Sequence, residues 1–336
     1  MPATPIRSDN MLCISVLSFI SSFLSGCSGC STAPIKCIED AGAIVNVERY
    51  PAVSGQEGWD QYNIAVTDVG AVDVMKVIRC ASHLEAREFK HLNLSDIQLT
   101  DDMWRKLKKC RCRCITLKNT GLNDDRCTLV PVNCVSLDLS NNPITDRGIR
   151  ELRFDRNAFS LNFSNTSVVG DSIDAFAPIN GVLDLSGCPI TDRIWGLLFG
   201  DVGVDCTTEL ICDETSVTGL GLAEVKNHSQ LCSLSCRHSQ FSDSACAALS
   251  RFTFLSHVYL DWTPVTDAGV IALCSNNYIA VLTLDGTAIT DKCVRDLIGQ
   301  KKMRELSVRH TGITHEGVAE LRLRLPNCVV TADDGT

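Results

Sequence analysis

The sequence repeats itself every 22 to 27 residues over most of its length. When the first residue of each unit is position 0, apolar residues, cysteine included, occupy positions 0, +2, +7, +12 and +15 of every unit. All fifty such positions match, whereas a chain with 45% hydrophobic residues would match about twenty-two by chance. A period of this length is typical of solenoids, in which stacked units share one continuous core. The ten units begin at Leu92, Ile115, Leu137, Leu161, Leu183, Leu210, Leu234, Val258, Leu282 and Leu306.

Each unit has the pattern of a short strand followed by a turn and a helix. Positions 0 and +2 alternate like one face of a strand, whereas positions +12 and +15 stand one helical turn apart. Position +8 is Ser or Thr in eight units and Asn123 in a ninth, and position +9 is Asp in seven. Such a side-chain oxygen caps free N–H groups, and the acid lies at the positive end of the helix dipole. The polar side chain at position +5 is expected to bond the backbone of the neighbouring turn.

The consensus of the units resembles the leucine-rich repeat. Residues 258–273 and 282–297 carry the pattern Leu-x-Leu-x-x-Thr-x-Ile-Thr-Asp-x-Gly-x-x-x-Leu nearly complete. It is closest to the cysteine-containing subtype with the Ile-Thr-Asp signature, known from F-box proteins and bacterial surface lipoproteins. The resemblance implies an α/β fold, a right-handed horseshoe-shaped solenoid with a parallel β-sheet on its concave face and helices on its convex face. Three units, beginning at 115, 161 and 210, depart from the pattern, and there turns are expected to replace helices.

The two ends of the array resemble caps, which are needed because a stacked array otherwise ends in an exposed apolar face. Short strands are expected at 43–47 and 63–66, a helix at 68–79, and a closing strand that reaches Val330. We divide the chain into a signal peptide, a tether, an N-terminal cap, the repeats, and a C-terminal cap strand with its tail, at residues 1–26, 27–37, 38–91, 92–323 and 324–336.

The N-terminus has the pattern of a cleaved signal. One cation, Arg7, precedes an apolar stretch at residues 11–24, which is shorter than the ~20 residues that a membrane-spanning helix needs. The sequence Leu24-Ser25-Gly26-Cys27 resembles a bacterial lipobox, which implies lipid attachment at Cys27. Ser28 after it implies an outer-membrane lipoprotein of the cell envelope. An ordinary secretory signal, giving a secreted protein, is the alternative.

The repeat register assigns several of the 19 cysteines to the core. Five occupy apolar columns or the polar position +5, where we expect buried thiols: Cys127, Cys188, Cys212, Cys236 and Cys246. A second cluster, Cys110, Cys112 and Cys114, alternates with basic residues. We expect these three to be oxidisable thiols in a surface turn or loop. A soft-metal site is the alternative, although the usual Cys-x-x-Cys pairs and a nearby His are missing.

Neither charge nor motifs point to nucleic acid, a cofactor or catalysis. The chain carries 31 Lys and Arg against 40 Asp and Glu, a net charge of −9, and lacks the basic surface that phosphate backbones require. It contains no phosphate-binding glycine loop, dinucleotide fingerprint or nucleophile elbow. His315-Glu316 begins like a zinc-protease motif, but Ala319 stands where the second His should be. We expect a non-catalytic protein with no cofactor and no metal.

Recognition of a protein partner is the function that this pattern favours. In a parallel stack, side chains at positions −1, +1 and +3 face the concave side, and position +4 lies on its rim. These positions are mostly small and neutral in the first half of the array, but aromatic and charged in the second half. Because aromatic residues and Arg are enriched in binding hot spots, we predict a partner-binding surface there. It comprises Arg237, His238, His257, Tyr259, Asp261, Trp262, Asp285, Arg309 and His310.

Three alternatives remain open. The charged residues could instead form a solvated face on which Asp213, Arg237 and Asp261 neutralise one another across adjacent strands. The chain could be an intracellular adaptor of the F-box kind that lacks the F-box, or an enzyme with its site on the concave face. We expect a monomer whose only membrane contact is the N-terminal lipid.

Overall fold

The computed structural model describes residues 38–39, 41–50, 59–66, 73–81, 89–132, 134–152, 159–173, 181–199, 207–225 and 230–333. The signal peptide, Cys27 and the tether that the sequence predicts lie outside the described residues.

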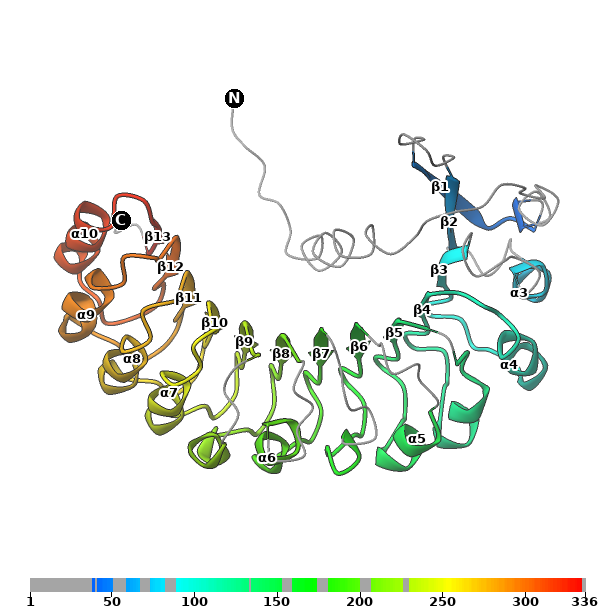
Figure 1. The fold of residues 1–336 in the computed structure, drawn as a ribbon, viewed down its shortest axis with the longest axis horizontal. Helices are drawn as coiled ribbons and strands as arrows, with labels where there is room; N and C mark the ends of the chain where they lie inside the picture. The colour runs from blue at the N-terminus through cyan, green and yellow to red at the C-terminus, as the bar shows by residue number, and fades with distance from the viewer. Residues whose placement is uncertain are drawn as a thin grey trace.

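Thirteen strands follow one another in sequence order across a single sheet, which lines the concave side of an arc (Figure 1). β1 and β2 pair antiparallel, and the later pairs are parallel. In the repeats, position 0 of one unit pairs with position 0 of the next, as Leu282 pairs with Leu306. The strands are β1 (Ile44–Tyr50), β2 (Trp59–Ala65), β3 (Phe89–Asn93), β4 (Cys114–Thr116), β5 (Ser136–Asp138), β6 (Ser160–Asn162), β7 (Val182–Asp184), β8 (Glu209–Ile211), β9 (Ser233–Ser235), β10 (His257–Tyr259), β11 (Val281–Thr283), β12 (Glu305–Ser307) and β13 (Val329–Thr331).

Helices cover the convex side of the arc (Figure 1). The α/β horseshoe with a parallel sheet inside and helices outside, which the sequence predicts, is confirmed. The α-helices are α3 (Val74–Ala81), α4 (Asp101–Leu107), α5 (Asp146–Glu151), α6 (Arg193–Phe199), α7 (Asp243–Leu249), α8 (Asp267–Leu273), α9 (Val294–Ile298) and α10 (His315–Arg324). The 3₁₀ helices are η2 (Asp124–Leu129), η4 (Leu220–Glu224) and η5 (Asp291–Cys293).

Two of the departing units carry 3₁₀ helices rather than the expected turns. They are η2, in the unit that begins at 115, and η4, in the unit that begins at 210. η4 follows Gly219, which has a left-handed φ of +79° and offers no side-chain cap. In a 3₁₀ helix, residues three apart lie on the same side, so positions +12 and +15 still both face the core. The unit that begins at 161 is described only as far as residue 173 and from 181 onward.

The N-terminal strands are longer than the sequence predicts, and the first helix begins later. β1 and β2 pair continuously from Ile44 opposite Ala65 to Tyr50 opposite Trp59, so the antiparallel pairing sets their length. α3 begins after Asp73, whose carboxylate accepts a hydrogen bond from the Lys76 amide at 2.9 Å. At the other end, β13 pairs with β12 at the place where a closing strand is expected.

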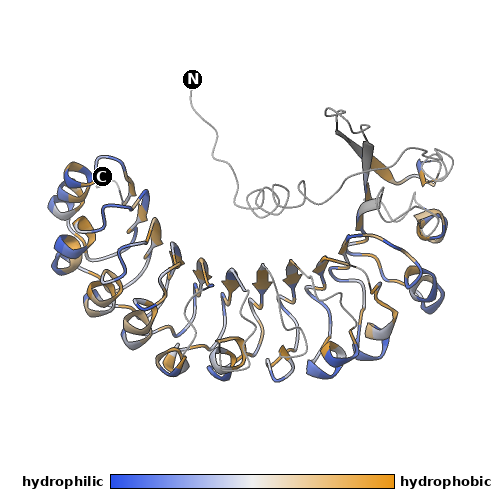
Figure 2. Ribbon diagram, in the orientation of Figure 1, coloured by the Kyte–Doolittle hydropathy of each residue, from blue (hydrophilic) through white to orange (hydrophobic). Residues whose placement is uncertain are grey.

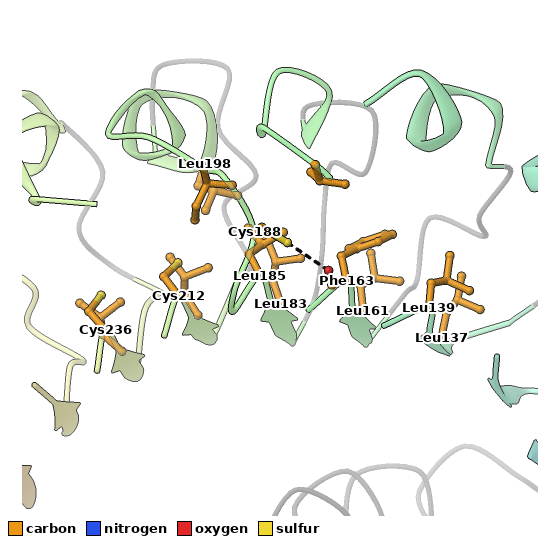
Figure 3. Packing of buried hydrophobic residues seen from close by; sticks show 14 of the residues in the cluster. Leu137, Leu139, Leu161, Phe163, Leu183, Leu185, Cys188, Leu198, Cys212 and Cys236 are labelled. Carbon is orange, nitrogen blue, oxygen red and sulfur yellow. Dashed lines mark hydrogen bonds between the residues drawn. The ribbon is translucent and has the colours of Figure 1, made fainter. Parts of the chain in front are cut away.

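The apolar columns of the repeat form the core. Every described residue of the five columns is buried, apart from Ile313, which is partly buried. Figure 2 shows hydrophobic residues on the strands and hydrophilic residues on the outer turns of the helices. In Figure 3 the core residues of successive strands stack in register, and Cys212 and Cys236 occupy the places that Leu185 and Phe163 fill in other units. The expected burial of the five cysteines is confirmed.

In five units the Asp at position +9 joins its unit to the next through a Thr. Its carboxylate accepts two hydrogen bonds from the Thr at position +8 of the following unit, one from the amide and one from the hydroxyl. Between Asp267 and Thr290 both distances are 2.7 Å. The same Thr hydroxyl also accepts from the amide of Lys292 and so caps its own helix. This bridge adds to the helix-dipole role that the sequence suggests, and it repeats at Asp124, Asp192, Asp243 and Asp291.

Most Thr and Ser side chains at position +5 bond their own turn, whereas the sequence placed these bonds on the neighbouring turn; Thr166 instead contacts Cys188 Sγ of the next unit at 3.4 Å. Thr263 donates to the Leu260 carbonyl three residues earlier at 2.7 Å, and the same bond recurs in other units. Two +5 side chains do reach across, as the sequence predicts: the Asn142 amide donates to the Leu117 carbonyl at 2.7 Å, and the Cys188 thiol donates to the Phe163 carbonyl at 3.1 Å.

The expectation of surface thiols at 110–114 is wrong for Cys110 and Cys112, which are buried. Cys112 Sγ lies 4.0 Å from Cys134 Sγ, at the same position of the next unit, and Cys110 Sγ donates to the Ile78 carbonyl at 3.7 Å. Burial raises the pKa of Cys110 to about 12, which leaves little reactive thiolate. Packing against the N-terminal cap and the next repeat therefore overrides the exposure that the basic neighbours suggest.

The Asp–Thr bridges predict a stability that depends on pH. Burial raises the pKa of Asp267, but the hydrogen bonds from Thr290 outweigh it and leave the pKa below its ordinary value of 3.8. A group whose pKa is depressed in the folded state contributes stability above its unfolded pKa and loses it as the pH falls through the folded pKa. We expect the urea midpoint of Asp267→Asn to be lower than wild type at pH 7 and to converge with it at acid pH.

Circular dichroism from about pH 3 to pH 7 measures this difference. Glu320→Gln, on the exposed side of α10, removes a carboxylate without such a bridge and serves as the control. An Asp267→Asn curve that runs parallel to wild type at every pH would contradict the role of the bridge.

Candidate functional site

Every unit turns through the left-handed region at the same place. At position +4 the φ angle lies between 52° and 68° in all ten units. Asp, Asn and Gly, which tolerate this conformation, fill the position in the first half of the array. The second half holds larger side chains except at Gly286. From the first unit to the last the residues are Asp96, Asn119, Asn141, Asn165, Gly187, Glu214, His238, Trp262, Gly286 and His310.

Three aromatic side chains at position +4 form a row along the rim, which we call the aromatic rim: His238, Trp262 and His310. The rings of His238 and Trp262 are stacked, with centroids 6.0 Å apart and planes 9° apart. Trp262 and His310 follow at 5.8 Å and 31°. Trp262 is 50% exposed. A bulky residue in the left-handed region costs about 1–2 kcal/mol, so the fold alone gives no reason to place Trp here.

Gly286 makes the row possible, because the indole of Trp262 lies against it. A Cβ atom at position 286 would come within 2.3 Å of the ring. The unit between Trp262 and His310 thus contributes a glycine that accommodates the ring of its neighbour, and the three aromatic residues span four successive strands.

A second exposed edge lies at the other end of the same strands, at position −4. We call it the second edge: Phe254, Tyr278 and Lys302. Phe254 is 59% exposed and Tyr278 is 51% exposed. The Lys302 ammonium lies 3.9 Å from the Tyr278 ring centroid, a cation–π contact between adjacent units. The sequence prediction missed this edge because it considered only positions −1 to +4 around each strand, although the spacing of 24 residues between Phe254, Tyr278 and Lys302 is visible in the sequence.

Between the two edges, β10 presents His257 and Tyr259 on the concave face. The Arg237 guanidinium lies 4.5 Å from the Tyr259 ring centroid. Its Nε is 2.8 Å from Asp261 Oδ2, and its Nη1 is 3.7 Å from Asp213 Oδ2. The mutual neutralisation of these three charged residues, left open from the sequence, is therefore present. Through the cation–π contact, Arg237 in turn holds the Tyr259 ring in place.

The aspartates at position +3 are engaged in bonds between strands. Asp285 Oδ1 accepts from the Ser307 hydroxyl and from the Arg309 amide, both at 2.7 Å. Asp261 accepts in the same way from Thr283 and from the amide of Asp285. Asp261 and Asp285, which the sequence places among the partner-binding residues, thus have a structural role that accounts for most of their hydrogen-bonding capacity.

Burial shifts the pKa of several groups on this face. It lowers the pKa of His257, against the opposing effect of Glu305, and Ser256 Oγ lies 2.8 Å from its Nδ1. It raises the pKa of Tyr259, which the Arg237 charge partly offsets. Burial also raises the pKa of Glu209, and the neighbouring Asp184 carboxylate raises it further. Burial thus favours the uncharged forms of His257, Tyr259 and Glu209, whose pKa values it shifts in that direction.

In the described ranges, no three His, Cys, Asp or Glu side chains gather so that they could hold a metal ion. Nor does any helix in the same ranges combine the length and apolar character needed to cross a bilayer.

Comparison with known proteins agrees with this architecture. The sequence profile of the family described as Leucine Rich repeat matches residues 135–152. An internalin from Listeria monocytogenes superposes with a TM-score of 0.54 and 17% identity, covering 81% of this chain and 72% of that one. A leucine-rich-repeat protein from Leptospira interrogans gives 0.52 and 14%, covering 76% and 62%. The fold is a leucine-rich-repeat solenoid. No curated protein matches the sequence.

The solenoid brings together the nine partner-binding residues that the sequence predicts. Six of them lie on or directly after β9 to β12 along the concave side, and the other three form the aromatic rim. Their role in binding stays a prediction. Cys27 is outside the described residues.

Replacing Gly286 tests whether the aromatic rim is a packed structure. We expect Gly286→Ala to lower the free energy of unfolding by about 1–2 kcal/mol and to displace the Trp262 ring, because the new Cβ collides with the indole. Thermal unfolding and acrylamide quenching of Trp fluorescence measure these effects. Gly196→Ala on α6, where a Cβ meets nothing within 4 Å, is the control. If the two variants behave alike, the ring does not rest on Gly286.

Proposed function

We propose that this protein is an exported, lipid-anchored recognition scaffold that binds another protein through the concave face and rims of β9 to β12. One observation carries the proposal: the aromatic rim holds exposed, stacked rings on a backbone turn that disfavours bulky residues. Since no requirement of folding explains this placement, we attribute it to binding.

The composition of the surface supports a protein ligand. Trp, Tyr and Arg dominate binding hot spots because they bury large areas with little loss of conformational freedom. Trp262, Tyr259 and Arg237 lie within adjacent units, and the last two are already held in contact. A leucine-rich-repeat array offers such residues along an extended concave surface. That fold hosts many ligands, so the argument depends on these residues rather than on the fold.

We propose a non-catalytic role. Three side chains of this face that could serve in acid–base chemistry are bound into the structure: Asp261 and Asp285 accept bonds between strands, and His257 contacts Ser256. Their geometry favours a fixed recognition surface over a reaction centre.

The anchor is tested by Cys27→Ala. If Cys27 is lipidated, wild type made in the native host or in a lipoprotein-processing bacterium incorporates radiolabelled palmitate and sediments with membranes. The variant should lose the label and appear in soluble fractions. Wild type that remains in the cytosol without label would contradict both export and anchoring.

Site-specific photocrosslinking tests the binding surface. A benzoylphenylalanine at position 262, on the aromatic rim, should yield a discrete crosslinked protein in the native cells. The same probe at Ile271, which is 41% exposed on α8 of the convex side, should not. A probe at Tyr278 of the second edge should capture the same protein. Adding Tyr259→Ala to that chain should abolish the capture. Equal crosslinking from positions 262 and 271 would remove this face from consideration.

A further inference from the structure

Charge is distributed unevenly along the concave side of the solenoid. From β7 to β12, positions −1, +1, +3 and +4 hold seven carboxylates and two guanidinium groups. The carboxylates belong to Asp184, Glu209, Asp213, Glu214, Asp261, Asp285 and Glu305, and the guanidinium groups to Arg237 and Arg309. From β3 to β6 the same positions hold only Asp96, Asp138 and Lys118 as charged residues, His apart. The excess of negative charge therefore coincides with the aromatic residues.

Most of these charges already have partners. Arg237 lies between Asp213 and Asp261, and Asp285 accepts from the hydroxyl and amide of the next strand. In the described part of the chain, the side chains of Glu209, Glu214 and Glu305 make no hydrogen bond or ion pair, and Glu214 lies exposed on the rim at position +4. Burial and the Asp184 carboxylate already disfavour the charged form of Glu209, as its raised pKa shows. A cation placed beside Glu209 would favour its charged form and so oppose both effects.

The two glutamates flank one aromatic line. Glu209 is on β8 and Glu305 is on β12, each two strands from β10, or about 10 Å away at the level of the backbone. Both act electrostatically on Tyr259. The side chains beside Tyr259 on β9 and β11 are small, Ser235 and Thr283. The carboxylates thus lie on either side of an aromatic centre, with the Arg237 guanidinium packed on the Tyr259 ring and held there by Asp213 and Asp261.

The aromatic line itself crosses the sheet within one unit. Phe254, His257, Tyr259 and Trp262 stand at positions −4, −1, +1 and +4 of the unit that contains β10. The line runs from the second edge, over the concave face, to the aromatic rim. Its two end residues, Phe254 and Trp262, are at least half exposed. A ligand that covers it meets apolar surface along the strand and negative charge on both flanks.

From this arrangement we infer that the partner presents a basic protein segment, which lies across β8 to β12. An apolar side chain of the segment packs on Tyr259 and Trp262, and Lys or Arg side chains on either side of it pair with Glu209 and Glu305. The inference rests on the proposed function, recognition of a protein by this face, and adds the chemistry of the segment recognised. Charge complementarity carries it: opposite charges across an interface steer association and exclude acidic competitors.

The test uses the soluble chain from Ser28 onward, and the probe is a random 12-residue peptide library displayed on phage. We expect selected peptides to be enriched in Lys and Arg around an aromatic or branched apolar residue. A synthetic peptide of the selected consensus should bind, as measured by fluorescence anisotropy, and its affinity should fall as NaCl rises from about 50 to about 300 mM.

Two double variants with the same change in net charge separate the site from a general electrostatic effect. Glu209→Gln with Glu305→Gln should weaken binding of the consensus peptide about tenfold or more. Glu151→Gln with Glu320→Gln, on exposed positions of α5 and α10, should leave it within about twofold. Circular dichroism verifies that all four substitutions leave the fold intact.

The possible outcomes separate the basic segment inferred here from the proposed protein-binding surface. Selection of acidic or uncharged peptides that Tyr259→Ala and Trp262→Ala abolish would overturn the basic segment and keep the proposed surface. The inference would be overturned if basic peptides bind the Glu209→Gln, Glu305→Gln variant with unchanged affinity. It would also be overturned if the selection returns no peptide. A concentration-dependent dimer that Trp262→Ala abolishes would make a second copy of this chain the occupant, and would overturn it as well.

Discussion

One backbone hydrogen bond sets the geometry on which the rest of the structure depends. The amide at position +4 of each unit donates to the carbonyl at position +3 of the next, at 2.7 to 3.0 Å, just beyond the strands. To make this bond the residue at +4 adopts positive φ, in unit after unit. At the last unit, where no further repeat follows in the described chain, the Asp333 carboxylate accepts the His310 amide instead. Side chains at +4 therefore emerge from the rim in fixed register, which lets rings in neighbouring units stack.

The same register decides which charges hold the array together and which remain available. On the convex side, Asp267 and its counterparts join the helix starts, and on the concave side Asp213, Asp261 and Asp285 join the strand ends. In earlier units the carboxylate stands at position +1 instead, and Asp184 bonds Ser186 in its own strand. Counting charges from the sequence treats all these groups alike. Within the described residues the hydrogen bonds leave the side chains of Glu209, Glu214 and Glu305 without a partner, and of these Glu209 and Glu305 stand at position −1 of the concave face as candidates for a ligand.

Much of the fold follows from periodicity, because burial of the five columns is required wherever units stack. The leucine columns, the helix starts and the concave position of Tyr259 could all be predicted on this basis. Features that depend on contact between units could not. The Asp at position +9 is already explained as part of a helix start, so the sequence gives no sign of its bridge to the Thr of the next unit. Gly286 matters only because Trp262 lies on it, and Cys112 is buried because Cys134 occupies the next unit. In each case the deciding residue is more than 20 positions away in the chain.

In the proposed function, the strained turns of the aromatic rim serve to present ordered rings to a partner. Left-handed backbone at Trp262 costs about 1–2 kcal/mol, while each ring contact along the rim returns about 0.5–1.5 kcal/mol. Stacking with His238 and His310, together with the fit against Gly286, thus offsets the strain in the free protein. The rings are ordered before any partner arrives, so a partner does not have to immobilise them, which costs about 0.5–1.5 kcal/mol per side chain elsewhere. A Trp on a flexible loop would expose the same area but would lose this advantage, which explains why the rim is a better place for it.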